Sequence, residues 1–233
     1  MTDASVWLIS AHIRSPASKR GRPKVEGLIE RRRDEIIDAA TTVFARDGFA
    51  CADLQDVADA IGVGKGTLYR YFPTKDQMFQ AAVDRVMSNM RASINTAVAG
   101  VDQPLDRIAA AVRAYLTYFD EHPEGVELII QERANFKDRK KPTYFAHREA
   151  NLHRWQDIYS TLIAEGRVRD IPVDRITDVM SNQLYGRVFT NYFAGRQKTL
   201  REQADDLLDV IWNGILTDKE RQARCRRKRE EQK

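Results

Sequence analysis

The sequence predicts an all-α protein, with three short helices near the N-terminus followed by a larger helical bundle. Apolar residues recur at intervals of three and four in successive segments, as they do on the buried face of an amphipathic helix. No segment alternates apolar and polar residues in the manner of a half-buried strand. Glycines and prolines separate the segments. The chain has 233 residues, 42% of them hydrophobic, which is enough to bury a substantial core.

Residues 1–30 are predicted to form a flexible basic arm. From Arg14 to Arg33 there are eight Lys or Arg residues and only two Glu, and prolines and glycines interrupt the early part. The segment Arg20-Gly21-Arg22-Pro23 resembles the core of an AT-hook, in which Arg20 and Arg22 would enter the narrow minor groove of A·T-rich DNA. A solvated basic tail that attracts phosphate without reading sequence is the alternative.

The first helix is predicted from Arg33 to Asp47. Its apolar residues share one face: Ile36, Ile37, Ala40, Val43 and Phe44. Gly48 ends it, because glycine adopts backbone conformations that other residues enter only at a cost.

Two short helices joined by a tight turn follow. The apolar face of the first consists of Leu54, Val57, Ala58 and Ile61. Gly62 stops this helix and turns the chain sharply. A second helix begins at about Lys65, with Leu68 and Phe72 facing inward. Such a pair is a helix-turn-helix, whose second helix can enter a major groove.

The second helix displays residue types that bind a nucleic-acid backbone. Lysines and hydroxyls hold phosphates, whereas an enzyme site needs a base or a nucleophile. The candidate DNA-binding residues are Lys65, Gly66, Thr67, Tyr69, Arg70, Tyr71 and Lys75. The alternative is an ordinary helical hairpin whose glycines only end helices.

This stretch resembles a known family. The matching residues are Val57-Ala58, Gly62-Val63, Lys65-Gly-Thr-Leu-Tyr-Arg-Tyr-Phe72 and Thr74-Lys75-Asp76. They are similar to the N-terminal domain of the tetracycline-repressor (TetR) family, over about Arg33 to Val86. The resemblance implies that Lys65, Thr67, Tyr69, Tyr71 and Lys75 contact DNA. Three positions depart from the family pattern. Ala52 replaces a capping threonine, leaving Asp53 as the cap, and Gly64 replaces a serine. Ile61 replaces a small alanine, which changes how the two helices pack.

A long helix from Thr74 to Ala99 is predicted to link two domains. Its inward residues are Met78, Phe79, Ala82, Val83, Val86, Met87, Met90 and Ile94. At about 1.5 Å per residue it spans roughly 40 Å, enough to leave a DNA-binding domain at 31–77 and enter a second domain at 78–217.

The second domain is predicted to be a helical bundle. Its segments are a helix from Pro104 to His122, a segment of unassigned type from Glu124 to Phe136, a charged loop from Lys137 to Lys141, and helices at Thr143–Glu165, Val173–Ala194 and Thr199–Leu216. Residues 218–233 form a charged tail, interpreted as a solubilising segment or a fraying helix end.

Aromatic residues mixed with a few polar ones favour a small-molecule cavity in this bundle. The candidates are Tyr115, Phe119, Glu132, Arg133, Phe136, Tyr144, His147, Trp155, Tyr159, Tyr185 and Phe189. An aromatic core without a cavity is the alternative. Members of the TetR family typically sense small effectors in this domain, so the resemblance implies an effector site.

The last two helices carry more apolar residues than one core-facing stripe needs, which indicates either deep burial or a partner subunit. Helix-turn-helix proteins usually bind as two-fold dimers, and the resemblance implies a four-helix interface made by these helices. The predicted interface residues are Leu184, Val188, Phe189, Tyr192, Leu208, Ile211, Trp212 and Ile215.

The remaining sequence features predict no cofactor, no metal site and no enzyme activity. Cys51 and Cys225 lack metal-ligand spacing and are predicted to be free thiols in a reducing cytoplasm. No apolar run is long enough to span a membrane. The sequence therefore predicts a cytoplasmic homodimeric transcriptional regulator, a repressor released from a palindromic double-stranded DNA operator by a small-molecule effector. The alternative is a constitutive DNA-binding or architectural protein without a ligand sensor.

Overall fold

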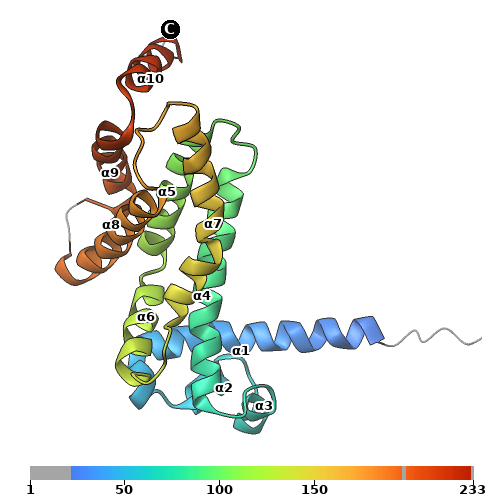
Figure 1. Ribbon diagram of the computed structural model, residues 1–233. Coiled ribbons are helices and arrows are strands. Elements are labelled where there is room, and N and C mark those ends of the chain that lie inside the picture. Colours follow the sequence, from blue (N-terminus) through green and yellow to red (C-terminus); the bar gives the residue numbers. More distant parts are fainter. Residues whose placement is uncertain (1–21, 196–197, 232–233) are drawn as a thin grey trace, which may run out of the picture.

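The computed structural model describes residues 22–195 and 198–231, and in these ranges every regular element is a helix. The ten helices are α1 (Arg22–Cys51), α2 (Leu54–Ala60), α3 (Lys65–Tyr71), α4 (Lys75–Val98), α5 (Pro104–Glu121), α6 (Pro123–Asn135), α7 (Thr143–Ala164), α8 (Val173–Ala194), α9 (Leu200–Ile215) and α10 (Asp218–Glu231). The predicted all-α fold is confirmed. Figure 1 shows α1 to α3 at one end of the molecule and α8 to α10 toward the other.

We call the three N-terminal helices and the start of α4 the head. They surround one apolar core. Its fully buried side chains include Ile36, Phe44, Leu68, Phe72 and Phe79. Gly62 has a φ of 65°, which only glycine adopts without strain, so the predicted turn between α2 and α3 is confirmed.

The first helix is longer than predicted, since it begins at Arg22 rather than Arg33. Pro23 fits in its first turn, where proline is tolerated because the amide hydrogen is not needed. Residues 22–30 of the predicted flexible arm are therefore helical. Figure 1 shows this part of α1 extending away from the other helices, with Leu28 57% exposed. Gly48, with a φ of 76°, interrupts the helix near its other end, as predicted.

The long helix α4 runs from the head into the second domain (Figure 1). Its predicted inward face is confirmed, with Met78, Phe79 and Met87 fully buried. The α5–α6 corner packs closely on it. Tyr118 donates a hydrogen bond of 3.0 Å to the Val86 carbonyl, and a Cβ at Gly125 would lie 2.7 Å from Val86 Cγ1.

Helix α6 joins the head to the second domain. Gln131 donates to the Phe44 carbonyl at 3.0 Å and accepts from the Phe49 amide at 2.8 Å. One buried side chain therefore hydrogen-bonds to α1 on both sides of Gly48. Phe136, just after α6, stacks on Phe79 with ring centroids 5.5 Å apart.

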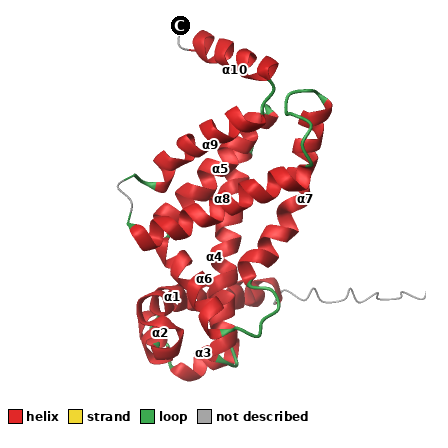
Figure 2. Cartoon of the chain, turned by 60° about the vertical axis from the view of Figure 1, so that its left-hand side comes forward, coloured by secondary structure: helices red, strands yellow, loops and turns green. Residues whose placement is uncertain are grey.

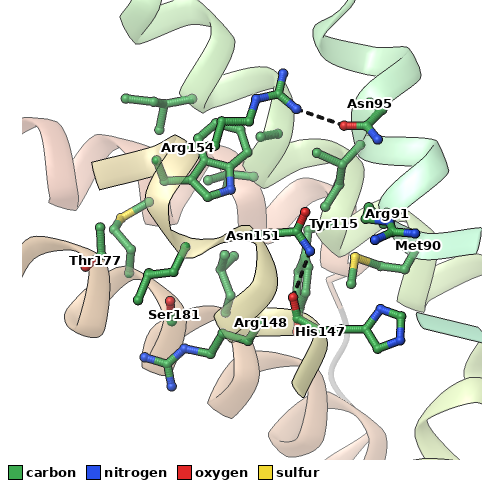
Figure 3. Close-up of a pocket in the computed structure, with 18 of the residues that line it drawn as sticks. Met90, Arg91, Asn95, Tyr115, His147, Arg148, Asn151, Arg154, Thr177 and Ser181 are labelled. Carbon is green, nitrogen blue, oxygen red and sulfur yellow. Dashed lines mark hydrogen bonds between the residues drawn. The ribbon is translucent and has the colours of Figure 1, made fainter. Parts of the chain in front are cut away.

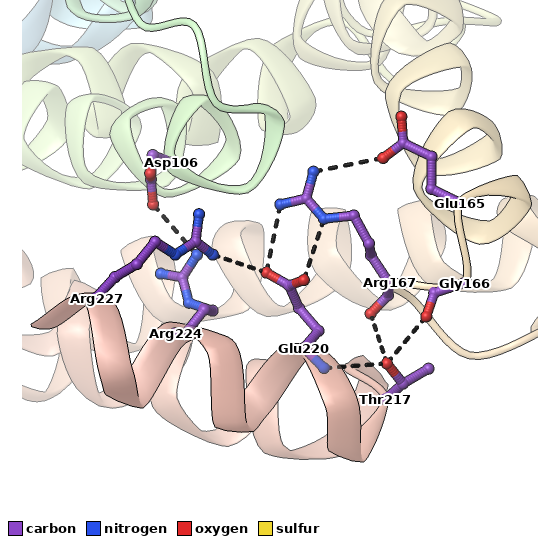
Figure 4. Close-up of polar contacts among 8 residues, drawn as sticks. All are labelled: Asp106, Glu165, Gly166, Arg167, Thr217, Glu220, Arg224 and Arg227. Atoms are coloured by element: carbon purple, nitrogen blue, oxygen red, sulfur yellow. Dashed lines mark hydrogen bonds and ion pairs between the residues drawn. The ribbon is translucent and has the colours of Figure 1, made fainter.

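The charged C-terminal segment is not a solvated tail over residues 218–231, because α10 is anchored by a buried carboxylate. Glu220 accepts from Arg167 in the α7–α8 connection and from Arg227 two turns further along α10 (Figure 4). Arg224 pairs with Asp106 on α5 at 3.2 Å and lies over the Trp212 ring. The spacing Glu220, Arg224, Arg227 places all three side chains on one face of the helix.

Candidate DNA-binding surface and ligand cavity

The helix-turn-helix is held in place by local caps. Asp53 is the N-cap of α2 and accepts a hydrogen bond of 2.8 Å from the Gln55 amide, the role left to it by alanine at position 52. Gly64 is the N-cap of α3 and makes no side-chain bond. Thr74 caps α4 by accepting from the Gln77 amide at 3.1 Å.

Lys65, the first residue of α3, is already paired. Its Nζ lies 2.7 Å from Asp53 Oδ1, and this contact raises the pKa of Lys65. The Gln55 amide, followed by Lys65, lowers the pKa of Asp53. Both side chains are exposed. Lys65 can therefore contact a DNA phosphate only if its ammonium group releases the Asp53 carboxylate.

The other predicted DNA-binding residues differ in exposure. Gly66, Tyr69 and Arg70 are exposed on α3, and Thr67 is half-buried. Tyr71 is half-buried and packs against the head core, with the Arg70 guanidinium over its ring.

Lys75 is bound to the protein backbone. It donates to the carbonyls of Ala52 at 2.6 Å and Ala50 at 3.3 Å, which supports the turn between α1 and α2. This contact was not predicted. The role of every one of these residues in DNA contact stays a prediction. Arg20 lies outside the described residues, and Arg22 is the first residue of α1.

A cavity lies between α4, α5, α7 and α8, in the second domain (Figure 3). It measures about 1010 Å³, counting the space open to solvent at its mouth. Most of its wall is apolar, with Met87, Met90, Ile108, Val112 and Leu184 among the lining residues. A mostly apolar lining with a few polar groups is typical of small-molecule sites.

The inner wall of the cavity carries phenol groups. Tyr115 and Tyr144 share a hydrogen bond of 3.0 Å, and burial raises the pKa of both, that of Tyr144 to about 12. Tyr159 is 2% exposed, and its hydroxyl has no hydrogen-bond partner among the described residues. Burial raises the pKa of Tyr159 as well, so all three phenols stay protonated at neutral pH.

The α4–α7 side of the cavity is polar. His147 Nε2 lies 2.7 Å from Asp84 on α4, and Arg154 donates to Asn95 at 2.9 Å (Figure 3 shows the second contact). His147 Nδ1 is buried and lacks a partner in the described part of the chain. Arg91 and Asn151 complete this side.

Five of the predicted pocket residues line this cavity: Tyr115, Tyr144, His147, Trp155 and Tyr159. Six lie elsewhere, namely Phe119, Glu132, Arg133, Phe136, Tyr185 and Phe189. Glu132 is 1% exposed and accepts from the Thr143 amide and hydroxyl and from Arg139, so it fixes the α6–α7 loop. Phe136 belongs to the aromatic cluster of the head.

Tyr185 and Phe189 form an aromatic stack along α8 beside the cavity, with centroids 4.3 Å apart. Phe119 packs on Tyr115 from behind. Arg133 is exposed and donates to the Lys137 carbonyl. The sequence reasoning missed the α4 lining residues Met87, Met90, Arg91, Ile94 and Asn95. Their spacing of three and four places them on one face of α4. The sequence analysis interprets this periodicity as a core-facing stripe, not as the wall of a cavity.

Most of the predicted interface residues are used inside the chain. Val188, Leu208, Ile211 and Trp212 are buried, and Leu184 lines the cavity. Phe189 belongs to the stack, and Tyr192 donates to Glu127 at 2.6 Å. Ile215 is half-buried and lines a groove between α8 and α9 together with Ile211, and Tyr192 is 38% exposed. The most exposed apolar residues of α8 and α9 are Val179, Phe193 and Val210, at 52%, 70% and 71%. Part of the apolar surplus of α8 covers the cavity, through Met180 and Leu184.

Within residues 22–195 and 198–231, no three His, Cys, Asp or Glu side chains are placed to hold a metal ion. In the same ranges no helix has the length and apolar character to cross a lipid bilayer.

Comparison with known proteins yields two family models and several relatives. Residues 36–82 match "Bacterial regulatory proteins, tetR family", and residues 101–215 match "Tetracyclin repressor-like, C-terminal domain". The chain is 24% identical over 197 residues to the transcriptional repressor KstR2 of Mycobacterium tuberculosis, covering 84% of this chain and 98% of KstR2. It is 28% identical over 102 residues to the transcriptional activator FasR of Mycolicibacterium smegmatis, covering 44% of this chain and 47% of FasR.

Solved structures show the same fold. The ketosteroid transcriptional regulator KstR2 of Mycobacterium tuberculosis superposes with a TM-score of 0.62 at 23% identity, over 80% of this chain and 96% of that one. The fatty acid degradation regulator FadR of Bacillus halodurans gives 0.66 at 15% identity, over 77% and 94%. Together, the two family models cover both the head and the bundle that forms the cavity. The chain belongs to the TetR family of DNA-binding transcriptional regulators.

Proposed function

We propose that this protein is a homodimeric repressor whose DNA binding is controlled by a small molecule in the α4–α5–α7–α8 cavity. The observation that carries the proposal is the double use of α4. Met78 and Phe79 are fully buried in the head, and Met87, Met90, Arg91, Ile94 and Asn95, further along the same helix, line the cavity. A ligand that displaces α4 would therefore shift the head, and its effect on DNA binding equals its differential affinity for the two positions.

Side-chain contacts extend this coupling to α1. Asp84 contacts the imidazole of His147, which belongs to the cavity wall. The next residue, Arg85, pairs with Asp34 and Asp38 on α1. A change at His147 would thus reach α1 through two adjacent residues of α4.

The dimer is proposed to form through α8 and α9. Val179 and Val210 are exposed and, with Ile215, line the groove between these helices. Val210→Glu should convert a dimer into a monomer in sedimentation analysis, because an unpaired charge would be buried at the interface. Arg201→Glu is the control, since nine residues place it on the opposite side of α9. A monomeric wild type, or a dimeric Val210→Glu variant, would contradict the interface.

Repression is proposed by analogy with KstR2, the relative that matches most of the chain, whereas FasR is an activator and matches less than half of it. The alternative of a constitutive DNA-binding protein lacks any use for a cavity with unpartnered polar groups. A duplex selected by the protein from random-sequence DNA would serve as operator. A small molecule that occupies the cavity should weaken binding of the protein to that duplex. Calorimetry measures the occupation, and Ala111→Trp should block it. A molecule that fills the cavity and leaves the duplex affinity unchanged would contradict ligand control.

A further inference from the structure

We propose that the cavity takes an apolar carboxylic acid, whose charged group lies at the α4–α7 side and whose apolar body fills the interior. The inference rests on the proposed function, because it names the ligand class of the same site. It is carried by the charge of the lining residues, the position of the polar side and the unpartnered polar groups.

The cavity wall is positively charged. Three arginines line it, Arg91, Arg148 and Arg154, and the lining includes no Asp or Glu among the residues that the structure describes. Arg148 is already neutralised by Asp178, at 2.8 Å. Arg91 and Arg154 have no carboxylate partner within residues 22–195 and 198–231. Two uncompensated guanidinium groups beside an apolar space favour an anion.

These two arginines share one side of the cavity. Asp84–His147 and Asn95–Arg154 are cross-links between α4 and α7 that mark two points along the seam of these helices. Arg91 lies on α4 between Asp84 and Asn95, one turn before Asn95. It is exposed, as is Arg154, so the charged group of a ligand would remain partly hydrated there.

The interior suits an apolar body. Met87, Met90 and Met180 contribute flexible thioether side chains, which adapt to irregular shapes, and Ala111 leaves room between them. An ionic group placed there would lose its hydration without a partner, so the charge belongs at the α4–α7 side.

Two buried polar atoms of the wall add groups that a ligand can pair with. Tyr159 Oη and His147 Nδ1 are both buried in the cavity wall without partners among the described residues. Unpaired buried polar groups are costly, and a ligand with an oxygen atom would satisfy them.

The test measures the affinity of the full-length dimer for three ten-carbon probes by calorimetry: decanoate, decan-1-ol and decylamine. Decanoate should bind at least about tenfold more tightly than the other two, the difference expected for one charge-assisted contact. The double variant Arg91→Gln, Arg154→Gln should remove about this factor for decanoate and leave decan-1-ol unchanged. Arg113→Gln is the control, since this arginine pairs with Asp205 outside the cavity. Tyr159→Phe keeps both cations and should preserve the preference for the acid.

Equal affinity for the alcohol or the amine, or an unchanged decanoate affinity in the double variant, would overturn the proposed ligand class. The same samples titrated against the selected duplex separate this failure from that of the proposed function. If decan-1-ol occupies the cavity and releases DNA, ligand control stands and the acid class is wrong. If decanoate binds with the expected preference and the duplex stays bound, the acid class stands and ligand control is wrong.

Discussion

The DNA-binding surface of the head and the cavity differ in how far apart in the sequence their residues lie. The candidate DNA-binding residues of the helix-turn-helix come from one continuous stretch, Lys65 to Lys75, and most of them lie on the surface. The cavity draws its residues from four helices between Met87 and Leu184 and turns them inward. A surface read by a rigid partner can be specified locally, whereas an internal space exists only once distant helices have packed. Only α4 belongs to both regions.

The largest expected effect separates the two regions completely. Replacing Lys65 and Tyr69 by alanine should lower affinity for the selected duplex about 100-fold, because each exposed contact contributes about 1–3 kcal/mol. Ligand affinity in the cavity should not change, since neither side chain lies near it. Fluorescence anisotropy and calorimetry on the same preparation measure both quantities. Duplex binding that survives the double substitution would show that α3 does not face DNA.

A second change weakens the joint between the regions. Gln131→Leu leaves the Phe49 amide and the Phe44 carbonyl without their partner, which should lower the free energy of unfolding by about 2 kcal/mol. Urea denaturation measures this loss. The control, Gln77→Leu, changes an exposed position on α4 and should cost less than about 0.5 kcal/mol. Similar losses in both variants would mean that the Gln131 contacts carry no special weight.

A third change should disconnect the regions while leaving each intact. His147→Ala removes the contact between the cavity wall and Asp84. We expect the loss of duplex affinity caused by saturating decanoate to shrink about tenfold, while duplex affinity without ligand stays the same. His153→Ala, an exposed position on the same helix, is the control. An unaltered ligand response would place the coupling in apolar packing alone.

The smallest expected effect lies within the head. Asp53→Asn preserves the N-cap of α2 but frees Lys65 and removes a negative charge beside the duplex, so affinity should rise about threefold. Asp59→Asn removes a neighbouring charge that does not touch Lys65 and serves as the control. Equal gains in both variants would indicate a general charge effect rather than release of Lys65.

The sequence predicted the head well because its signals are local. Gly62, the periodic apolar faces and the capping residue Asp53 act within a few residues of themselves, and each lies where expected. Predicting the interior of the second domain required knowing how helices cross. Aromatic composition suggested Glu132 and Phe136 as pocket residues, yet the first ties down the α6–α7 loop and the second joins the head.

The interface residues show the same limit. Periodicity identifies an apolar face on α8 but not whether it covers a cavity, a neighbouring helix or another subunit. Leu184 lines the cavity, and Val188 and Trp212 are buried within the chain. Val179 and Val210 therefore remain to contact another subunit.

The central claim is that filling the cavity moves the two heads of the dimer. Cys51 lies exposed on the head, and Cys225→Ser leaves it as the only cysteine. A spin label at Cys51 then reports the distance between the two heads by electron–electron double resonance, after duplex binding of the labelled protein has been verified. We predict one narrow distance distribution on the duplex, and a shift away from it when saturating decanoate releases the DNA. An identical distribution in the DNA-bound and decanoate-bound dimers would contradict the account.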